Sequence, residues 1–91
     1  MDVRRRKLLF RADHRGFKEM DLIMGGFAKT HIEELDDDQL DQFERLLDAG
    51  DQEVYGWILE NEETPDEYQG SVLNWLRKFD VAAYMKSVGL L

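Results

Sequence analysis

The sequence of 91 residues has no cysteine, a single proline and no apolar run longer than a few residues. The absence of cysteine excludes a disulfide framework, a thiolate metal site and a thiol nucleophile. A membrane-spanning helix needs about 18 consecutive apolar residues, so no direct membrane insertion is expected. Arg11 and Asp13 follow the basic start in place of an apolar segment, so no signal peptide is expected. These absences favour a bacterial cytoplasmic location over the mitochondrial matrix.

The net charge of −8 is unevenly distributed along the chain. Residues 1–18 hold seven cations against two acids, a net +5, and the remaining residues hold eighteen acids against five cations, a net −13. Nucleic-acid binding requires a basic face that neutralises phosphates, so the overall acidity argues against a nucleic-acid partner. The basic N-terminal arm nevertheless leaves one alternative open. In that alternative the chain is an acidic adaptor or regulator whose arm binds another protein or a nucleic acid.

The apolar residues recur at helical spacing, and neither strict alternation nor a hairpin turn signal is present. This pattern predicts an all-α fold, a compact antiparallel bundle of about five short helices, in one domain spanning residues 1–91. The predicted helices cover residues 3–13, 17–33, 36–49, 51–61 and 64–79. Residues 1–14 would hold the basic first helix, and residues 80–91 would form a loosely ordered tail with a short helical turn.

Glycines and capping residues define the predicted boundaries. Gly16 is expected to stop the first helix in a left-handed conformation. Gly25-Gly26, inside the second helix, favours the close approach of another helix. Residues 36–39 form a capping box, and Asp51 is expected to cap the fourth helix. Residues 64–67, Thr-Pro-Asp-Glu, are expected to cap the fifth helix.

The motifs of common catalytic and metal sites are absent from the sequence. The acidic residues 36–41 do not match an EF-hand loop, since leucine and aspartate stand where an oxygen ligand and glycine are needed. The two histidines, His14 and His31, form no close ligand pair. No P-loop, dinucleotide fingerprint or nucleophile elbow occurs. The chain is therefore predicted to be an interaction protein rather than an enzyme, and a small metal-dependent enzyme is the weakest alternative.

The stretch of residues 14–21 lies where the basic arm meets the acidic body, and it is the candidate partner-binding surface. The candidate partner-binding residues are Arg11, His14, Arg15, Gly16, Glu19 and Asp21. A simpler interpretation is that Arg15 and Glu19, four residues apart, form a surface ion pair worth about 0.3–0.5 kcal/mol. Within the same stretch Phe17 and Met20 are expected in the core. Trp57 and Trp75 are expected in the core as well.

Residues 15–21, Arg-Gly-Phe-Lys-Glu-Met-Asp, closely resemble the motif of the RGxxE succinate dehydrogenase assembly factors. Further landmarks follow in the same order. They are Phe27, Leu35-Asp36-Asp37, Phe43-Glu44-Arg45-Leu46-Leu47, and Asp51 followed by Trp57. Met20 replaces the usual leucine, and Asp36 replaces the usual serine or threonine cap. The resemblance covers residues 4–59, and the last third of the chain carries little of it.

The resemblance implies an assembly factor that binds the flavoprotein subunit of succinate dehydrogenase and promotes covalent attachment of FAD to that subunit. Fumarate reductase flavoproteins are the second clients that it implies. FAD would be the cofactor of the client, and no bound cofactor or metal is expected in this chain. The bond-forming chemistry would belong to the flavoprotein, and the factor would favour its reactive arrangement. Arg15, Gly16 and Glu19 are the residues that match the motif.

Overall fold

The computed structural model describes residues 1–90, which form six α-helices, two short 3-10 turns and no strand. The helices are α1 (Val3–Ala12), α2 (Lys18–His31), α3 (Asp37–Asp48), α4 (Asp51–Ile58), α5 (Ser71–Lys78) and α6 (Val81–Ser87), and the 3-10 turns are Ile32–Glu34 and Asp66–Tyr68. The all-α class is confirmed, with one helix more than expected. Within these residues no helix has both the length and the apolar character that a membrane span requires.

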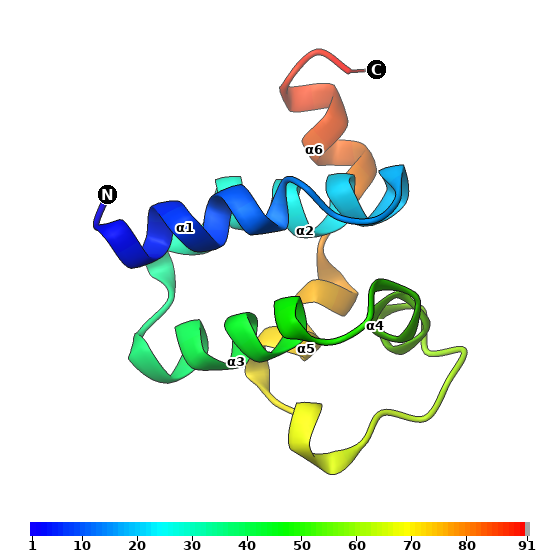
Figure 1. Cartoon of the computed structure of the whole chain (residues 1–91). Helices are drawn as coiled ribbons and strands as arrows, with labels where there is room; N and C mark the ends of the chain where they lie inside the picture. Colours follow the sequence, from blue (N-terminus) through cyan, green and yellow to red (C-terminus); the bar gives the residue numbers. More distant parts are fainter. Residues whose placement is uncertain (91) are drawn as a thin grey trace.

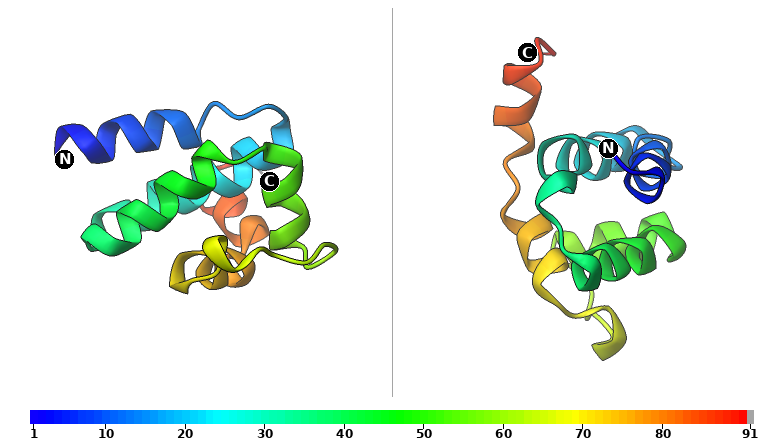
Figure 2. Two further views of the ribbon diagram at one scale, coloured as in Figure 1. Left: turned by 60° about the horizontal axis from the view of Figure 1, so that its bottom comes forward. Right: turned by 90° about the vertical axis from the view of Figure 1, so that its left-hand side faces the viewer.

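The helices pack in two layers (Figure 1). The antiparallel helices α1 and α2 form one layer, and α3 and α5 lie beneath them. The antiparallel arrangement does not extend to every helix. Figure 1 shows α4 almost end-on, so it runs across α3, and α6 stands upright against α2 in both Figure 1 and the right-hand view of Figure 2. The connection between α1 and α2 is joined to the start of α4, because Arg15 and the Gly16 N–H bind the carboxylate of Asp51.

The core lies between the layers and is centred on Phe27 of α2, which is fully buried. Its ring packs against the rings of Phe43 and Trp75, with centroids 5.7 and 5.3 Å away. Met20 and Trp57 are buried as predicted, whereas Trp75 is half-buried at the margin of the core. The core therefore joins α2 to α3 and α5.

Gly25 and Gly26 mark two close contacts on a continuous α2, as the sequence predicts. A Cβ on Gly25 would lie 3.2 Å from the Cα of Asp13, directly after α1. A Cβ on Gly26 would lie 2.8 Å from the ring of Tyr84 in α6. Both glycines are buried, so larger residues would push α1 and α6 away from α2.

The caps of α3 and α4 differ. In α3 the predicted capping box is confirmed: Asp36 Oδ1 accepts from the Gln39 N–H at 2.8 Å, and Gln39 Oε1 accepts from the Asp36 N–H at 3.1 Å. In α4 the predicted cap is wrong, because Gly50 occupies the cap position and Asp51 is the first helical residue. The Asp51 carboxylate is instead bound to residues before α2.

The helix predicted from residues 64–67 is also displaced. These residues lead into a 3-10 turn, and α5 begins only at Ser71. Thr64 is buried, and its hydroxyl accepts a hydrogen bond of 2.9 Å from Arg77 Nη2 instead of capping a helix. The N-terminus of α5 is satisfied by α3, since Gln42 Oε1 accepts from the Val72 N–H at 3.1 Å. Tertiary contacts therefore set the start of α5.

The C-terminal segment forms more helix than the short turn expected from the sequence. Helix α6 has seven residues, and Asp80 caps it by accepting from the Ala83 N–H at 2.9 Å. None of its residues is buried, so it adds a covering element to α2 and contributes little to the core. That residues 80–91 are loosely ordered stays a prediction.

Candidate functional site

The basic N-terminal segment is a helix whose arginines pair with acids of α3. Arg4 Nη2 lies 2.5 Å from Asp41 Oδ1 and 3.1 Å from Glu44 Oε1. Hydrogen bonds to Asp41 and then Glu44 hold the pKa of Arg4 above its ordinary value. Two turns further along α1, Arg11 Nη2 lies 2.5 Å from Asp48 Oδ1. The charge asymmetry seen in the sequence is thus partly neutralised within the chain.

Arg5 ties α1 to the connection between α2 and α3. Its Nε donates to the Ile32 carbonyl at 3.0 Å, and its Nη2 donates to the Leu35 carbonyl at 2.6 Å. Asp2, which caps α1, accepts from the Arg5 N–H and pairs with its guanidinium. The hydrogen bond from the Arg5 N–H, and after it the bond from the Arg5 guanidinium, lower the pKa of Asp2. Arg5 therefore holds the helix in place and is not available as a free surface cation.

Residues 14–21, here called the motif corner, join α1 to α2, and Gly16 is not the left-handed stop that was predicted. Within residues 1–90 left-handed φ angles occur at Glu60 and Gly89 and not at Gly16. The Gly16 N–H instead donates to Asp51 Oδ2 at 2.6 Å, and a Cβ on Gly16 would lie 2.7 Å from the same oxygen. Glycine is suited to this position because a carboxylate approaches it closely, while its other side is exposed.

Arg15 points into the molecule. Its Nε and Nη2 lie 2.9 and 2.8 Å from Asp51 Oδ1, and we call this pair the Arg15–Asp51 clamp. Nη2 also donates to the Leu47 carbonyl at 2.8 Å, and Nη1 to the Arg11 carbonyl at 3.2 Å. Only 12% of the Arg15 side chain and 20% of the Asp51 side chain are exposed. The surface pair with Glu19, which was the simpler interpretation of the sequence, is therefore not formed.

Asp21 and Phe17 hold the other side of the motif corner. Asp21 Oδ1 accepts a short hydrogen bond from the Arg15 N–H, so the carboxylate fixes the backbone just before α2. Phe17 stands at the cap position of α2, and its ring meets that of Tyr55 edge-on, with centroids 5.3 Å apart. Phe17 is half-buried, at the margin of the core rather than inside it. Both residues attach the corner to the rest of the fold.

The exposed residues of the motif corner are His14, Gly16, Lys18 and Glu19. Glu19 has no side-chain hydrogen bond or ion pair with any other described residue, so its carboxylate is available. The His14 ring stacks on Phe10 at a centroid distance of 4.0 Å, and its Nδ1 lies 2.7 Å from the Phe10 carbonyl. The structure thus divides the predicted site residues. Arg15 is internal, Asp21 and Arg11 are partly covered, and the other three face outward.

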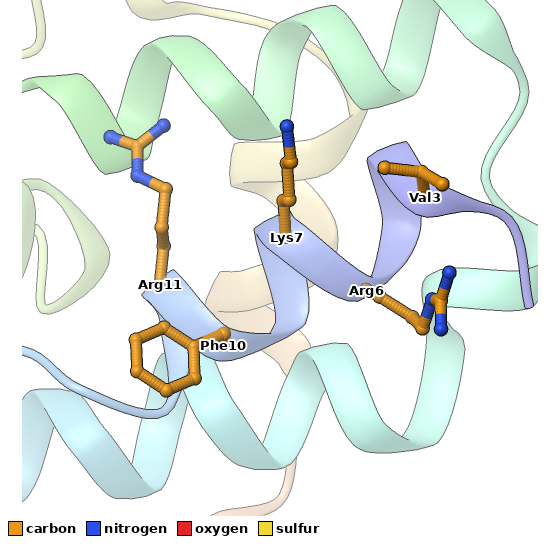
Figure 3. A pocket seen from close by; sticks show the side chains of 5 residues that line it. All are labelled: Val3, Arg6, Lys7, Phe10 and Arg11. Carbon is orange, nitrogen blue, oxygen red and sulfur yellow. The ribbon is translucent and has the colours of Figure 1, made fainter.

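The outer face of α1 is a surface that the sequence prediction missed. Figure 3 shows a shallow, open hollow on this face, and it is lined by Val3, Arg6, Lys7, Phe10 and Arg11. Val3 and Phe10 are 56% and 64% exposed. The sequence contains a signal for this second face of the helix, because Val3, Lys7 and Phe10 recur at intervals of four and three residues. It was overlooked because the buried stripe of Leu8 and Ala12 already accounted for the helix.

The described residues offer carboxylates and cations, but no clustered metal ligands. Residues 1–90 contain no group of three or more histidine, aspartate and glutamate side chains placed to hold one ion. A second open groove lies among α2, α5 and α6, lined by aromatic residues that include Trp75, Phe79 and Tyr84. Both hollows are shallow. The motif corner remains the place where exposed polar groups are combined with an internally fixed backbone.

These features define a class of small all-helical proteins in which the connection between the first two helices is fixed from within by an arginine–aspartate pair. Comparison with known families identifies the group. The model of the family described as flavinator of succinate dehydrogenase matches residues 6–80, and the chain belongs to this family. The match confirms the resemblance and extends it beyond residue 59, into the last third of the chain.

Curated relatives carry names that agree with the family. A protein of Danio rerio is 32% identical over 81 residues, covering 87% of this chain and 51% of that protein. One of Dictyostelium discoideum is 39% identical over 69 residues (76% and 49%), and one of Meyerozyma guilliermondii is 35% identical over 81 residues (85% and 60%). Each is named "succinate dehydrogenase assembly factor 2, mitochondrial". The chain spans about half the length of the curated relatives it matches.

The relatives correct the expected location. A bacterial cytoplasmic protein was predicted from the basic start and the absence of an apolar segment after it. The relatives come from eukaryotes and are named mitochondrial, and this finding overturns the prediction. The composition of the first residues was therefore a poor guide to the compartment.

Proposed function

We propose that this protein binds the flavoprotein subunit of succinate dehydrogenase and promotes covalent attachment of FAD to it. The observation that carries the proposal is the family match over residues 6–80, which includes the whole motif corner. The names of the relatives, assembly factors of succinate dehydrogenase, support a role in assembly. Flavoproteins of fumarate reductase are proposed as second clients.

The motif corner is the proposed docking surface. Gly16 presents exposed backbone on the side away from Asp51, where a partner can contact it. Glu19 presents a carboxylate that can accept charge-assisted hydrogen bonds from a cation or from N–H groups of the partner. His14 is exposed beside them, and Arg11 and Asp21 flank the surface. The partner would meet a fixed backbone with one free carboxylate.

The factor would act on the conformation of its client. We propose that the flavoprotein and its FAD carry the bond-forming chemistry, since cofactors supply such reactivity and the protein supplies orientation. Binding at the motif corner would favour the arrangement in which the flavoprotein residue and the flavin react. A binding protein shifts such an equilibrium only by its differential affinity for the two arrangements. The proposed role requires neither a bound cofactor nor a catalytic residue in this chain.

The alternative of an adaptor that uses a basic arm is not favoured by the structure. Nucleic-acid binding depends on cations that are free to neutralise phosphates. Arg4, Arg5, Arg11 and Arg15 are instead occupied by carboxylates or carbonyls of the same chain. Arg6 and Lys7 remain exposed on α1, which is a small basic surface on an acidic protein. We therefore propose a protein partner and no nucleic-acid partner.

The test uses cells that lack this factor and produce the flavoprotein, complemented with wild type, Glu19→Ala or Glu33→Ala. Glu33→Ala makes the same change at another exposed position, just after α2. Covalent flavin is measured as fluorescence of the flavoprotein band in a denaturing gel. Wild type and Glu33→Ala should restore it, and Glu19→Ala should leave it low while retaining wild-type helicity. Normal covalent flavin in cells without the factor would refute the proposed function.

A further inference from the structure

We propose that Asp51 is a positioning residue for the motif corner, and that Arg15 acts through Asp51 rather than by touching the partner. This inference rests on the proposed function and says how its docking surface is built. It separates two internal residues that fix the backbone, Arg15 of the motif and Asp51 of α4, from two outward residues of the motif, Gly16 and Glu19, that meet the flavoprotein.

The two oxygens of Asp51 hold consecutive residues of the corner. Oδ1 receives Nε and Nη2 of Arg15 at 2.9 and 2.8 Å, and Oδ2 receives the Gly16 N–H at 2.6 Å. Both guanidinium nitrogens meet the same oxygen, so the second oxygen of the carboxylate is left to accept from the backbone of the next residue. Because Oδ2 belongs to the same rigid carboxylate, the orientation of Arg15 also sets where Gly16 lies.

Arg15 has little donor capacity left for a partner. Each of its three side-chain nitrogens already donates within the chain, to Asp51 and to the carbonyls of Arg11 and Leu47. Its side chain is 12% exposed, so a partner would have to break these bonds before it could bind the guanidinium. Breaking a partly buried charge pair is costly. Contact through the exposed Gly16 and Glu19 requires no such rearrangement.

The Arg15–Asp51 clamp also affects the position of Glu19, because the backbone of Arg15 is bound to the first turn of α2. The Arg15 N–H donates to Asp21 Oδ1 in the first turn of α2, while the Arg15 side chain is held by Asp51 at the start of α4. Glu19 lies in that same turn of α2, between Arg15 and Asp21 in the sequence. Loss of the Asp51 carboxylate should therefore free the Arg15–Gly16 segment and change its position relative to Glu19.

Asp51 also lies in the first turn of α4, where any acid is favourable next to the helix dipole. Asp51→Asn removes the charge that serves both roles, whereas Asp51→Glu keeps a charge in the first turn of α4 and displaces it from Arg15. In Asp51→Asn the amide oxygen can still accept from the Gly16 N–H, whereas the NH2 group cannot accept from the guanidinium. The matched control is Asp41→Asn, which removes an ion pair between Arg4 and α3 without touching the motif corner.

The experiment measures binding of the purified chain to the purified flavoprotein, together with covalent flavin formation as the factor concentration is raised. Asp51→Asn should weaken binding by about tenfold or more, because the apparent affinity falls in proportion to the fraction of molecules whose motif corner keeps the binding arrangement. Covalent flavin formation at saturating factor should stay at the wild-type rate. Asp41→Asn should stay within about twofold of wild type. All binding is measured well below the unfolding temperature of each variant, with helicity checked.

Double variants separate positioning from contact. If Arg15 acts only through Asp51, Arg15→Gln should weaken binding in the wild-type background and add little in the Asp51→Asn background. Glu19→Ala should add its full loss in both backgrounds. If the substitutions acted only by weakening the fold, the losses from Arg15→Gln and Glu19→Ala would not differ in their dependence on Asp51. If Asp51→Asn is unfolded at the assay temperature, Asp51→Glu replaces it, with the same pattern expected, because its longer side chain displaces the carboxylate.

Two results would overturn the inference while leaving the proposed function intact. One is wild-type affinity of folded Asp51→Asn. The other is an equal loss from Arg15→Gln in both backgrounds, which would mean that Arg15 touches the partner. Failure of the proposed function looks different, since wild-type protein itself would then neither bind the flavoprotein nor raise its covalent flavin.

Discussion

Gly16→Ala should destabilise the fold by a steric route that depends on Asp51. A Cβ at this position would lie 2.7 Å from Asp51 Oδ2, closer than non-bonded carbon and oxygen atoms approach. The oxygen cannot simply turn away, because the other oxygen of the carboxylate is held by Arg15. Backbone strain is not the cause, since Gly16 does not have a positive φ that alanine would resist.

The expected magnitude follows from two opposing effects. Displacing the carboxylate weakens the bond from the Gly16 N–H, and a hydrogen bond to a charged group contributes about 1.5–3 kcal/mol. Replacing glycine by alanine restricts the unfolded chain, which returns about 0.4–1 kcal/mol. The net loss should be about 1–2 kcal/mol. For a domain of this size each kcal/mol lowers Tm by about 4–8 °C, so Tm should fall by roughly 5–15 °C.

The assay is thermal unfolding followed by circular dichroism for wild type, Gly16→Ala, Asp51→Ala and the double variant. Without the carboxylate, alanine at position 16 has room, so the second substitution should cost much less in the Asp51→Ala background. The same loss in both backgrounds would refute the steric argument. So would a Gly16→Ala variant that is as stable as wild type.

Two further predictions concern stability alone. Phe27→Ala should cost about 3–5 kcal/mol, because Phe27 is fully buried among aromatic rings, whereas Phe10→Ala on the exposed face of α1 should cost about 0.5 kcal/mol or less in chemical denaturation. A hydrogen bond to Asp13, followed by contacts with Tyr84, raises the pKa of Lys29 above 10.5. The contribution of Lys29 to the free energy of unfolding is therefore complete below pH 10.5, and it is lost as the pH rises through the higher pKa of the folded state. Wild type should therefore lose stability more steeply than Lys29→Met in alkaline urea titrations, and parallel curves would contradict this.

Local signals in the sequence were sufficient for most of the fold. The capping box of Asp36 and Gln39 fixes the start of α3 because its donors and acceptors lie within one turn. The Gly25-Gly26 pair indicated the close approach of another helix, and α1 and α6 meet α2 there. Such features can be predicted because their physical cause lies within a few residues of their effect.

The features that were predicted wrongly depend on partners distant in the sequence. The start of α5 was placed at a local capping signal, but Gln42, thirty positions before Val72, satisfies the helix end instead. Asp51 was taken for a cap, yet its oxygens bind residues 35 and 36 positions away. A carboxylate near a helix start can bind its own helix or a neighbouring segment, and only the packing of α1 against α3 and α4 decides between them.

The same reasoning explains why the motif looked like a set of surface contacts. An arginine four residues before a glutamate forms a surface pair only if both lie on one helix. Helix α2 begins at Lys18, so Glu19 is on it and Arg15 is not. Arg15 lies in the connection, where its side chain can turn toward α4, and the clamp with Asp51 fixes the backbone that carries Gly16. The spacing between Arg15 and Glu19 therefore joins the internal Arg15–Asp51 clamp to an exposed carboxylate. Substitutions in the clamp should alter the position of the backbone, whereas substitution of Glu19 should remove a contact with the partner.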